Sequence, residues 1–305
     1  MAREGHGETR PETGRAGEDR DRARCDERRR RERSPGGPRR HDRTEECLGR
    51  SREPLPTRVE DGPPLPPAYA DALEAALAGL AIDLDPVARA AIDGHVRLLL
   101  AWNASINLTA VRDPAHVAVR HVADSLTARD VLDMDGIDAF LDIGSGGGFP
   151  GLPLAASLPS VEALLVDSIG KKARFLEVAA AATGLAGRVR VGSVRAEALA
   201  VDRRHRERWP AVTVRAVAAL AELVELAFPL LAPGGLLIAW KRDSIDAEAT
   251  AGRRAIEALG GGSLEVRPIA WTGLDGHVLV LARRDRGAVP SGYPRDPAER
   301  RRHPW

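Results

Sequence analysis

The chain has 305 residues with 45 Lys or Arg against 44 Asp or Glu, so its net charge of +1 points to no class of partner. This length can bury a substantial core, and two cysteines, Cys25 and Cys47, are too few for a disulfide framework. No apolar run approaches the roughly 18 residues of a membrane span, and the first residues are too charged for a signal peptide. We therefore expect a cytoplasmic protein that does not enter the membrane.

Residues 1–66 are dominated by Arg, Asp and Glu and contain few apolar side chains. Such a segment buries too little surface to offset its ordering entropy. We expect a disordered, charged N-terminal extension that ends in the Pro-rich stretch 63–67. The arginine run 28–31 could bind nucleic acid, but the acidic residues interleaved with it favour a solvated segment.

Residues 67–128 are predicted to form a cap of three helices. Asp85-Pro86 and Asp113-Pro114 are both typical of an N-cap residue followed by proline in the first helical turn. The third helix is expected to end near Thr127. The first helix is indicated by leucines at helical spacing, which are Leu73, Leu77, Leu80 and Leu84.

Residues 129–283 alternate short apolar runs with helix-like stretches, which predicts an α/β fold around a mostly parallel sheet. The expected helices lie near 150–158, 170–183 and 217–231. The runs 264–267 and 277–281 follow each other closely and predict an antiparallel pair at one edge. The remaining residues, 284–305, are expected to be a basic tail with little to pack. Buried strands are predicted at 139–143, 161–166, 189–191, 212–214 and 236–240.

The stretch Asp142–Gly151 follows the first predicted strand, and its glycines let the backbone approach a ligand. Gly146, Gly148 and Gly151 fit the dinucleotide pattern G-x-G-x-x-G. Asp142, Gly144 and Gly146 instead fit the D-x-G-x-G loop of methyltransferases that bind S-adenosylmethionine. A carboxylate beside the loop would repel a pyrophosphate but suit an ammonium and a sulfonium, which favours the second interpretation.

A carboxylate also ends the second predicted strand. Asp167 can accept hydrogen bonds from ribose hydroxyls in either cofactor, or it can cap the next helix. After the third strand comes Arg195-Ala196-Glu197, at the place where such folds usually hold adenine.

Several blocks match one known family in order: 102–109, 120–126, 144–151, 167–172, 195–197, 215–217, 233–235 and 293–295. Over residues 70–295 the chain resembles the RsmG (GidB) family, which methylates N7 of a guanine in 16S ribosomal RNA. The resemblance implies a Rossmann-like class I methyltransferase sheet, mostly parallel with an antiparallel edge strand, and an N-terminal helical extension. It implies cofactor contacts at Gly144, Phe149, Ala196, Glu197 and Arg215.

Two positions depart from the family pattern. Val214 stands where the family usually carries Ser before the Arg, and Arg242 stands where Gly usually follows Lys241. Both changes bear on the substrate rim and leave the expected cofactor site intact. That site comprises Asp142, Gly146 and Asp167 in addition to the residues that the resemblance implies.

The RNA is expected to meet a basic surface beside the loop. Lys171 and Lys172 begin a helix there, as phosphate contacts or as merely solvated residues. Arg120, Lys241 and Arg295 could extend that surface. Asn107 and His121 either stabilise the helical cap or lie where the target base enters. The histidines show no metal-ligand spacing, so no metal is expected.

Guanine N7 carries a free lone pair, so its methylation needs orientation and no general base. His121 is the one histidine to suspect as a base, with a pKa expected between about 6 and 8. We expect a monomer that acts on 16S ribosomal RNA or the small subunit with S-adenosylmethionine. The alternatives are a catalytically silent RNA-binding or ribosome-assembly factor and a nicotinamide-dependent oxidoreductase.

Overall fold

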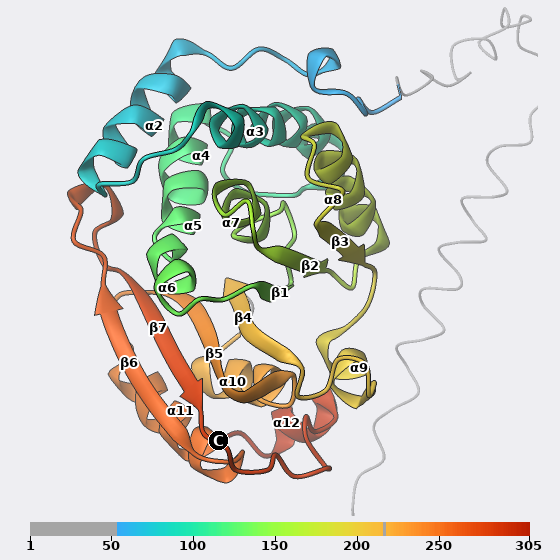
Figure 1. Ribbon diagram of the computed structural model, residues 1–305, viewed down its shortest axis with the longest axis vertical. Helices are drawn as coiled ribbons and strands as arrows, with labels where there is room; N and C mark the ends of the chain where they lie inside the picture. The colour runs from blue at the N-terminus through green and yellow to red at the C-terminus, as the bar shows by residue number, and fades with distance from the viewer. Residues whose placement is uncertain (1–53, 216–217) are drawn as a thin grey trace, which may run out of the picture. The chain divides into compact units, whose positions relative to one another are not determined.

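The computed structural model describes residues 54–215 and 218–305, and Figure 1 shows a central sheet with helices on both faces. Seven strands are joined in the order β3-β2-β1-β4-β5-β7-β6. All neighbours are parallel except β7, which is antiparallel to β5 and to β6. The strands are β1 (Ala139–Ile143), β2 (Glu162–Val166), β3 (Val189–Gly192), β4 (Trp209–Arg215), β5 (Leu231–Arg242), β6 (Gly262–Pro268) and β7 (His277–Arg284).

The predicted mixed sheet with an antiparallel pair at its edge is confirmed. The strand that runs against the others is β7, one position inside the edge strand β6. The short link between these two strands allows only a hairpin, whereas each parallel neighbour needs a long crossover connection.

Asp85 and Asp113 begin helices as expected, because the carboxylate of each accepts backbone N–H groups of the first turn. The second of these helices runs from Pro114 to Leu126 as three joined pieces, α4 (Pro114–Val117), the π-helical η2 (Ala118–Ala123) and α5 (Asp124–Leu126). The other helices are η1 (Val59–Asp61), α2 (Pro67–Gly79), α3 (Pro86–Ile106), α6 (Arg129–Met134), α7 (Gly151–Ser157), α8 (Gly170–Ala182), α9 (Ala196–Val201), α10 (Leu220–Ala227), α11 (Asp246–Ala258), η3 (Thr272–Leu274) and α12 (Pro297–Arg302).

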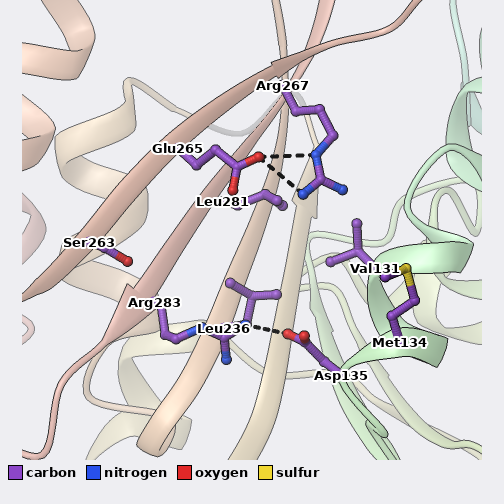
Figure 2. Close-up of a pocket in the computed structure, with 9 residues that line it drawn as sticks. All are labelled: Val131, Met134, Asp135, Leu236, Ser263, Glu265, Arg267, Leu281 and Arg283. Atoms are coloured by element: carbon purple, nitrogen blue, oxygen red, sulfur yellow. Dashed lines mark hydrogen bonds and ion pairs between the residues drawn. The ribbon is translucent and has the colours of Figure 1, made fainter.

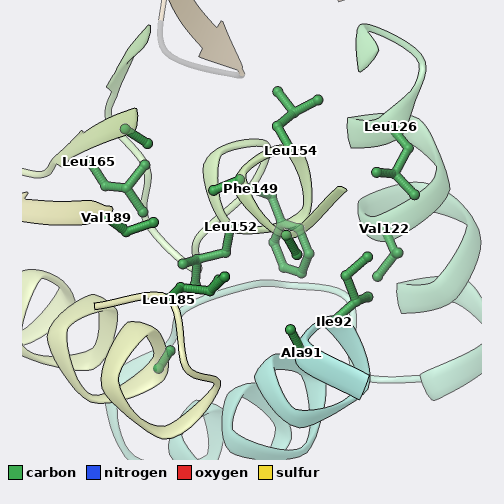
Figure 3. Packing of buried hydrophobic residues seen from close by; sticks show 14 of the residues in the cluster. Ala91, Ile92, Val122, Leu126, Phe149, Leu152, Leu154, Leu165, Leu185 and Val189 are labelled. Atoms are coloured by element: carbon green, nitrogen blue, oxygen red, sulfur yellow. The ribbon is translucent and has the colours of Figure 1, made fainter. Parts of the chain in front are cut away.

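The core is divided by the sheet, because successive side chains of a strand point to opposite faces. Phe140 belongs to the cluster under α2, α3, α7 and α8, whereas its neighbour Leu141 belongs to the cluster under α9, α10 and α11. Figure 3 shows the first cluster, where Phe149 and Leu152 meet Ile92 of α3. Side chains at alternate positions of β1 therefore reach the face on which the Asp142–Gly151 loop is packed.

The expected disordered extension is partly wrong, since residues 54–66 are packed. Leu55, Val59 and Leu65 contact the first core cluster, and the indole of Trp102 donates to the carbonyl of Pro56 at 2.7 Å. Few apolar side chains are enough here, because α3 supplies the surface that covers them. Residues 1–53, including both cysteines and the arginine run 28–31, lie outside the described residues.

Candidate active site

The Asp142–Gly151 loop joins β1 to α7 at the carboxyl end of the sheet. The amides of Gly144 and Ser145 donate to the carbonyl of Val166 at 2.8 and 3.0 Å, which ties the loop to the end of β2. Gly144 and Gly146 have φ of +72° and +53°, a region that side chains with a Cβ rarely adopt. Glycine is therefore required where the backbone turns back over the strand ends.

The two later glycines are required by packing. A Cβ on Gly148 would lie 2.8 Å from Nε2 of His95, and a Cβ on Gly151 would lie 2.3 Å from a methyl group of Leu165. By contrast, the nearest atom to a Cβ on Gly146 would be 3.7 Å away. A Cβ on Gly146 would thus make only ordinary contacts, with the carbonyl of Gly144 and the carboxylate of Asp167.

Asp167 lies at the end of β2 and is almost fully buried. Its Oδ2 accepts the amide N–H of Gly146 at 3.0 Å, and its Oδ1 accepts that of Ile169, the residue before α8, at 2.8 Å. Asp167 therefore holds the turn that precedes α8 and lies against the loop, but it does not cap the helix, whose N-cap residue is Ile169. A carboxylate has about four acceptor sites, so lone pairs remain for hydroxyl groups of a ligand.

A cavity of about 390 Å³ opens beside Asp167, at the carboxyl ends of β1, β2 and β3. In open α/β sheets this is the edge at which ligands bind. Four of the predicted cofactor residues line it, Gly144, Asp167, Ala196 and Glu197. The remaining lining residues are Ile143, Val166, Ser168, Val194, Arg195, Ala218, Glu222, Leu226, Pro297, Arg300 and Arg301.

Asp142 is fully buried and does not line the cavity. Its Oδ1 accepts the hydroxyl of Thr213 at 2.8 Å, and its Oδ2 lies under Gly151, 2.8 Å from the place of an added Cβ. Burial raises the pKa of Asp142 to about 6, against the hydrogen bonds and Arg215, which lower it. The expectation that this carboxylate faces a ligand's ammonium is therefore wrong. Asp142 supports the loop from beneath.

Phe149, His121 and Arg215 form a second cluster at the same end of the sheet. The ring of Phe149 stacks on that of His121 at 4.9 Å, and the guanidinium carbon of Arg215 lies 5.5 Å from the centre of the Phe149 ring. His95 of α3 contacts the other side of Phe149 at 4.7 Å and fixes the loop through a 2.7 Å hydrogen bond to the carbonyl of Gly147. No local pattern in the sequence pointed to His95.

Both ring nitrogens of His121 have polar neighbours within the protein. Nδ1 lies 3.0 Å from Nη2 of Arg215, which can only donate, and 3.1 Å from the carbonyl of Arg120, which can only accept. Nε2 lies 2.6 Å from the hydroxyl of Thr109, which can do either. Burial, helped by Arg215, lowers the pKa of His121 to about 4. The expected pKa between 6 and 8 is therefore wrong.

Asp124 anchors this cluster and is buried. Its two carboxylate oxygens accept from Arg215 at 3.1 Å and from Nδ1 of His277 at 3.0 Å, and its backbone carbonyl accepts from the indole of Trp240. The charge of Arg215 is thereby paired inside the protein. His277 is more than 150 residues away in sequence, so local patterns could not reveal the network.

The five predicted RNA-binding residues fall into two groups. Arg120 and Lys171 are exposed and Lys172 is half-buried. Lys241 is paired with Glu248 at 2.6 Å, and Arg295 is paired with buried Glu225 through several hydrogen bonds. The last two charges are neutralised by the protein itself.

Three other predicted positions are placed as follows. Asn107 is exposed and ends α3 with φ of +48°. Val214 is buried in the second core cluster, and Arg242 is exposed at the end of β5. Neither departure from the family pattern lines the cavity beside Asp167.

A second hollow of about 240 Å³ lies between α6 and the β6–β7 hairpin (Figure 2). Arg267 pairs with Glu265 along its rim, and Arg283 pairs with Asp135. None of the predicted site residues lines this hollow. Within residues 54–215 and 218–305, no three His, Cys, Asp or Glu side chains are grouped so as to hold a metal ion. The helices of the same residues include none that is long and apolar enough to cross a bilayer.

Comparisons with known proteins agree on one family. The family model GidB, described as rRNA small subunit methyltransferase G, matches residues 89–270. A protein of Roseiflexus castenholzii named ribosomal RNA small subunit methyltransferase G is 42% identical over 65% of this chain and 83% of its own length. Proteins of the same name from Symbiobacterium thermophilum and Deinococcus deserti are 37% and 40% identical over 75% and 74% of this chain, and 94% and 93% of their own lengths.

Among solved structures, an O-methyltransferase from Bacillus cereus in complex with SAH is 18% identical, with a TM-score of 0.47 over 70% of this chain and 97% of that one. The family model spans more than half of this chain, and its match includes the loop, Asp167, Glu197 and Arg215. The chain therefore belongs to the rRNA small subunit methyltransferase G family of S-adenosylmethionine-dependent methyltransferases.

Proposed function

We propose that this protein transfers a methyl group from S-adenosylmethionine to N7 of a guanine in 16S ribosomal RNA, in the cytoplasm and without a general base. The observation that carries the mechanism is that both ring nitrogens of His121 already have hydrogen-bond partners within the protein, Nδ1 beside Arg215 and the carbonyl of Arg120, and Nε2 beside Thr109. Family membership supports the cofactor and the RNA substrate.

The cavity beside Asp167 has the groups that the cofactor requires. Asp167 retains acceptor capacity for ribose hydroxyls, and the turn of Ala196 and Glu197 forms the wall of the same cavity. A side chain on Gly146 would start beside the carboxylate of Asp167, 4.0 Å from its Oδ2. S-adenosylmethionine, when bound there, supplies an electrophilic methyl group.

The second cluster is suited to positioning an acceptor and excluding water. Phe149 is packed between His95 and His121, so its ring has little freedom to move. Arg215 is held by Asp124 and His121, and its charge needs no partner from the substrate. Guanine N7 has no proton to lose, so these residues only have to hold the base in line with the methyl group. Asn107, exposed at the end of α3, is a candidate to contact the base.

The RNA backbone is proposed to contact Arg120, Lys171 and Lys172. Lys171 and Lys172 belong to the first turn of α8, the helix that begins three residues after Asp167. Phosphate contacts of this kind supply much of the affinity of a protein for RNA. Because Lys241 and Arg295 are already paired with Glu248 and Glu225, we leave them out of this surface.

The direct experiment is nucleoside mass spectrometry of 16S ribosomal RNA after reaction with the protein and methyl-labelled cofactor. The expected product is labelled 7-methylguanosine, from naked RNA or from small subunits. A protein that binds both RNA and cofactor but yields no labelled nucleoside would be a silent assembly factor. Label in another nucleoside would contradict the N7 assignment.

A further inference from the structure

The C-terminal residues 289–305, here called the strap, are packed against the protein, although a tail with little to pack was expected. Arg206 donates to the carbonyls of Val289, Pro290 and Tyr293 at 2.9 to 3.3 Å. Val289 itself is buried in the second core cluster. The strap thus leaves β7 along a fixed path.

Both ends of the remaining strap are fastened to one buried carboxylate. Glu225 of α10 is completely buried and accepts hydrogen bonds from the guanidinium and the amide of Arg295. The indole of Trp305 donates to the same side chain at 2.6 Å, and the Arg295 guanidinium lies 4.9 Å from the centre of a Trp305 ring. Between these two anchors stands α12.

Helix α12 forms one side of the cavity beside Asp167, through Pro297, Arg300 and Arg301. With the strap in place the cavity keeps a volume of about 390 Å³, within the range of about 300–1,000 Å³ typical of small-molecule sites. The strap therefore borders the cavity on one side and does not fill it.

Arg300 connects the strap to two of the three acidic residues that line the cavity. Its Nη2 donates to Glu197 at 2.6 Å, its Nε donates to Glu222 at 3.2 Å, and its Nη1 donates to the carbonyl of Arg295 at 2.9 Å. The side chain of Arg300 is only 9% exposed. Glu197 and Glu222 come from different helices, α9 and α10, so a single planar guanidinium fixes both carboxylates relative to the strap.

We propose that the strap is a wall of the cofactor pocket and that Arg300 is a positioning residue that holds the Glu197 carboxylate for the nucleoside part of S-adenosylmethionine. This inference rests on the proposed function, which assigns the cavity to that cofactor. A positioning role differs from a purely structural one, because its effect on affinity must pass through Glu197.

The test is equilibrium binding of S-adenosylmethionine and S-adenosylhomocysteine, measured by calorimetry, with melting temperatures for every variant. Arg300→Ala is expected to weaken both ligands about tenfold. Arg300→Lys keeps the positive charge but lacks the planar guanidinium that donates to two carboxylates at once. This variant should recover part of the affinity. Arg302→Ala is the matched control, because Arg302 is exposed on the same helix and its side chain donates only to the carbonyl of Ala298.

A double-mutant cycle separates positioning from general damage. If Arg300 acts through Glu197, then Arg300→Ala in a Glu197→Gln background should change affinity by less than about twofold. An equal loss in both backgrounds would overturn the inference, as would wild-type affinity or tighter binding by Arg300→Ala. Failure of the wild-type protein to bind either ligand would instead refute the proposed function.

Discussion

At the carboxyl ends of the strands, the charged side chains over β1, β2 and β3 are placed differently from the one over β4. Over β1, β2 and β3, Asp167 and Glu197 face a cavity. Over β4, Arg215 is enclosed by Asp124, His121 and Phe149, and its charge is paired inside the protein. The difference indicates a division of labour, in which one half binds a polar ligand and the other positions the acceptor without exchanging protons.

The largest expected effect tests the binding half. Gly146→Val places a β-branched side chain at φ of +53°, with its Cβ about 4.0 Å from Oδ2 of Asp167. We expect cofactor affinity to fall at least about 100-fold, or about 2.7 kcal/mol. Gly136→Val is the control, because Gly136 has φ of +62° with no neighbour for a Cβ within 4 Å, on the turn before β1. Retained binding by Gly146→Val in a calorimeter would remove the loop from the site.

The second prediction concerns the buried ion pair of Arg215 and Asp124 over β4. Arg215→Ala leaves Asp124 buried without its cation, which costs about 3–5 kcal/mol for buried pairs. Denaturant unfolding should show a loss of that order. Arg190→Ala removes an exposed pair with Glu162 and should cost less than about 1 kcal/mol. Similar losses in the two variants would show that the Arg215 network is not a buried structural unit.

The third prediction concerns pH. Burial lowers the pKa of His95 from 6.5 to about 4, so between those values the unfolded chain binds a proton that the folded chain excludes. The free energy of unfolding should therefore fall as the pH drops from 6.5 to 4, with about 3 kcal/mol of this loss due to His95. His95→Gln should flatten that dependence in denaturant titrations at several pH values.

Asp142 provides a control, because its effect on the pH dependence of stability is expected to have the opposite sign to that of His95. Burial raises its pKa from 3.8 to about 6, so the folded chain keeps a proton that the unfolded chain has lost, and stability falls as pH rises through this window. Asp142 therefore offsets part of the stability that His95 loses at low pH. Asp142→Asn should make the free energy of unfolding fall more steeply with decreasing pH, whereas His95→Gln should make it fall less steeply. The same direction of change in both variants would contradict the account of burial.

The smallest effect is expected at the basic surface. Lys171→Ala combined with Lys172→Ala should reduce the slope of log RNA affinity against log salt concentration by about 1.5, because two phosphate contacts are lost. Arg174→Ala on the same helix is the control, since Arg174 is already paired with Glu177. An unchanged slope, measured by filter binding across salt concentrations, would show that both lysines are solvated and do not contact RNA phosphates.

The strands and the loop could be predicted from the sequence because apolar runs and glycine spacing are local signals. The predicted strand 139–143 coincides with β1, and the predicted helix 170–183 with α8 to within one residue. Helix α11 was not predicted, because its buried positions are mainly small residues such as Ala249, Gly252 and Ala255, which give a weak hydrophobic pattern.

The contacts that complete the site could not be predicted, because they join distant parts of the chain. Arg300 reaches Glu197 across 103 positions, and Arg215 reaches Asp124 across 91. The burial of Asp142 follows from its face of β1 and from the absence of a side chain at Gly151. The motif identified the residue type but not the direction in which the carboxylate points.

The most direct test of the central claim is the single-turnover rate of methyl transfer to 16S ribosomal RNA between pH 6 and 8, at saturating cofactor and RNA. Because the pKa of His121 is about 4, a base at His121 would also give a flat profile in this range, so the variant decides. We predict a nearly flat profile and a chemical step in His121→Gln within about threefold of the wild type, although RNA binding or stability suffers. A rate that climbs about tenfold per pH unit, or a loss of about 100-fold or more in His121→Gln at every pH, would show a general base at work.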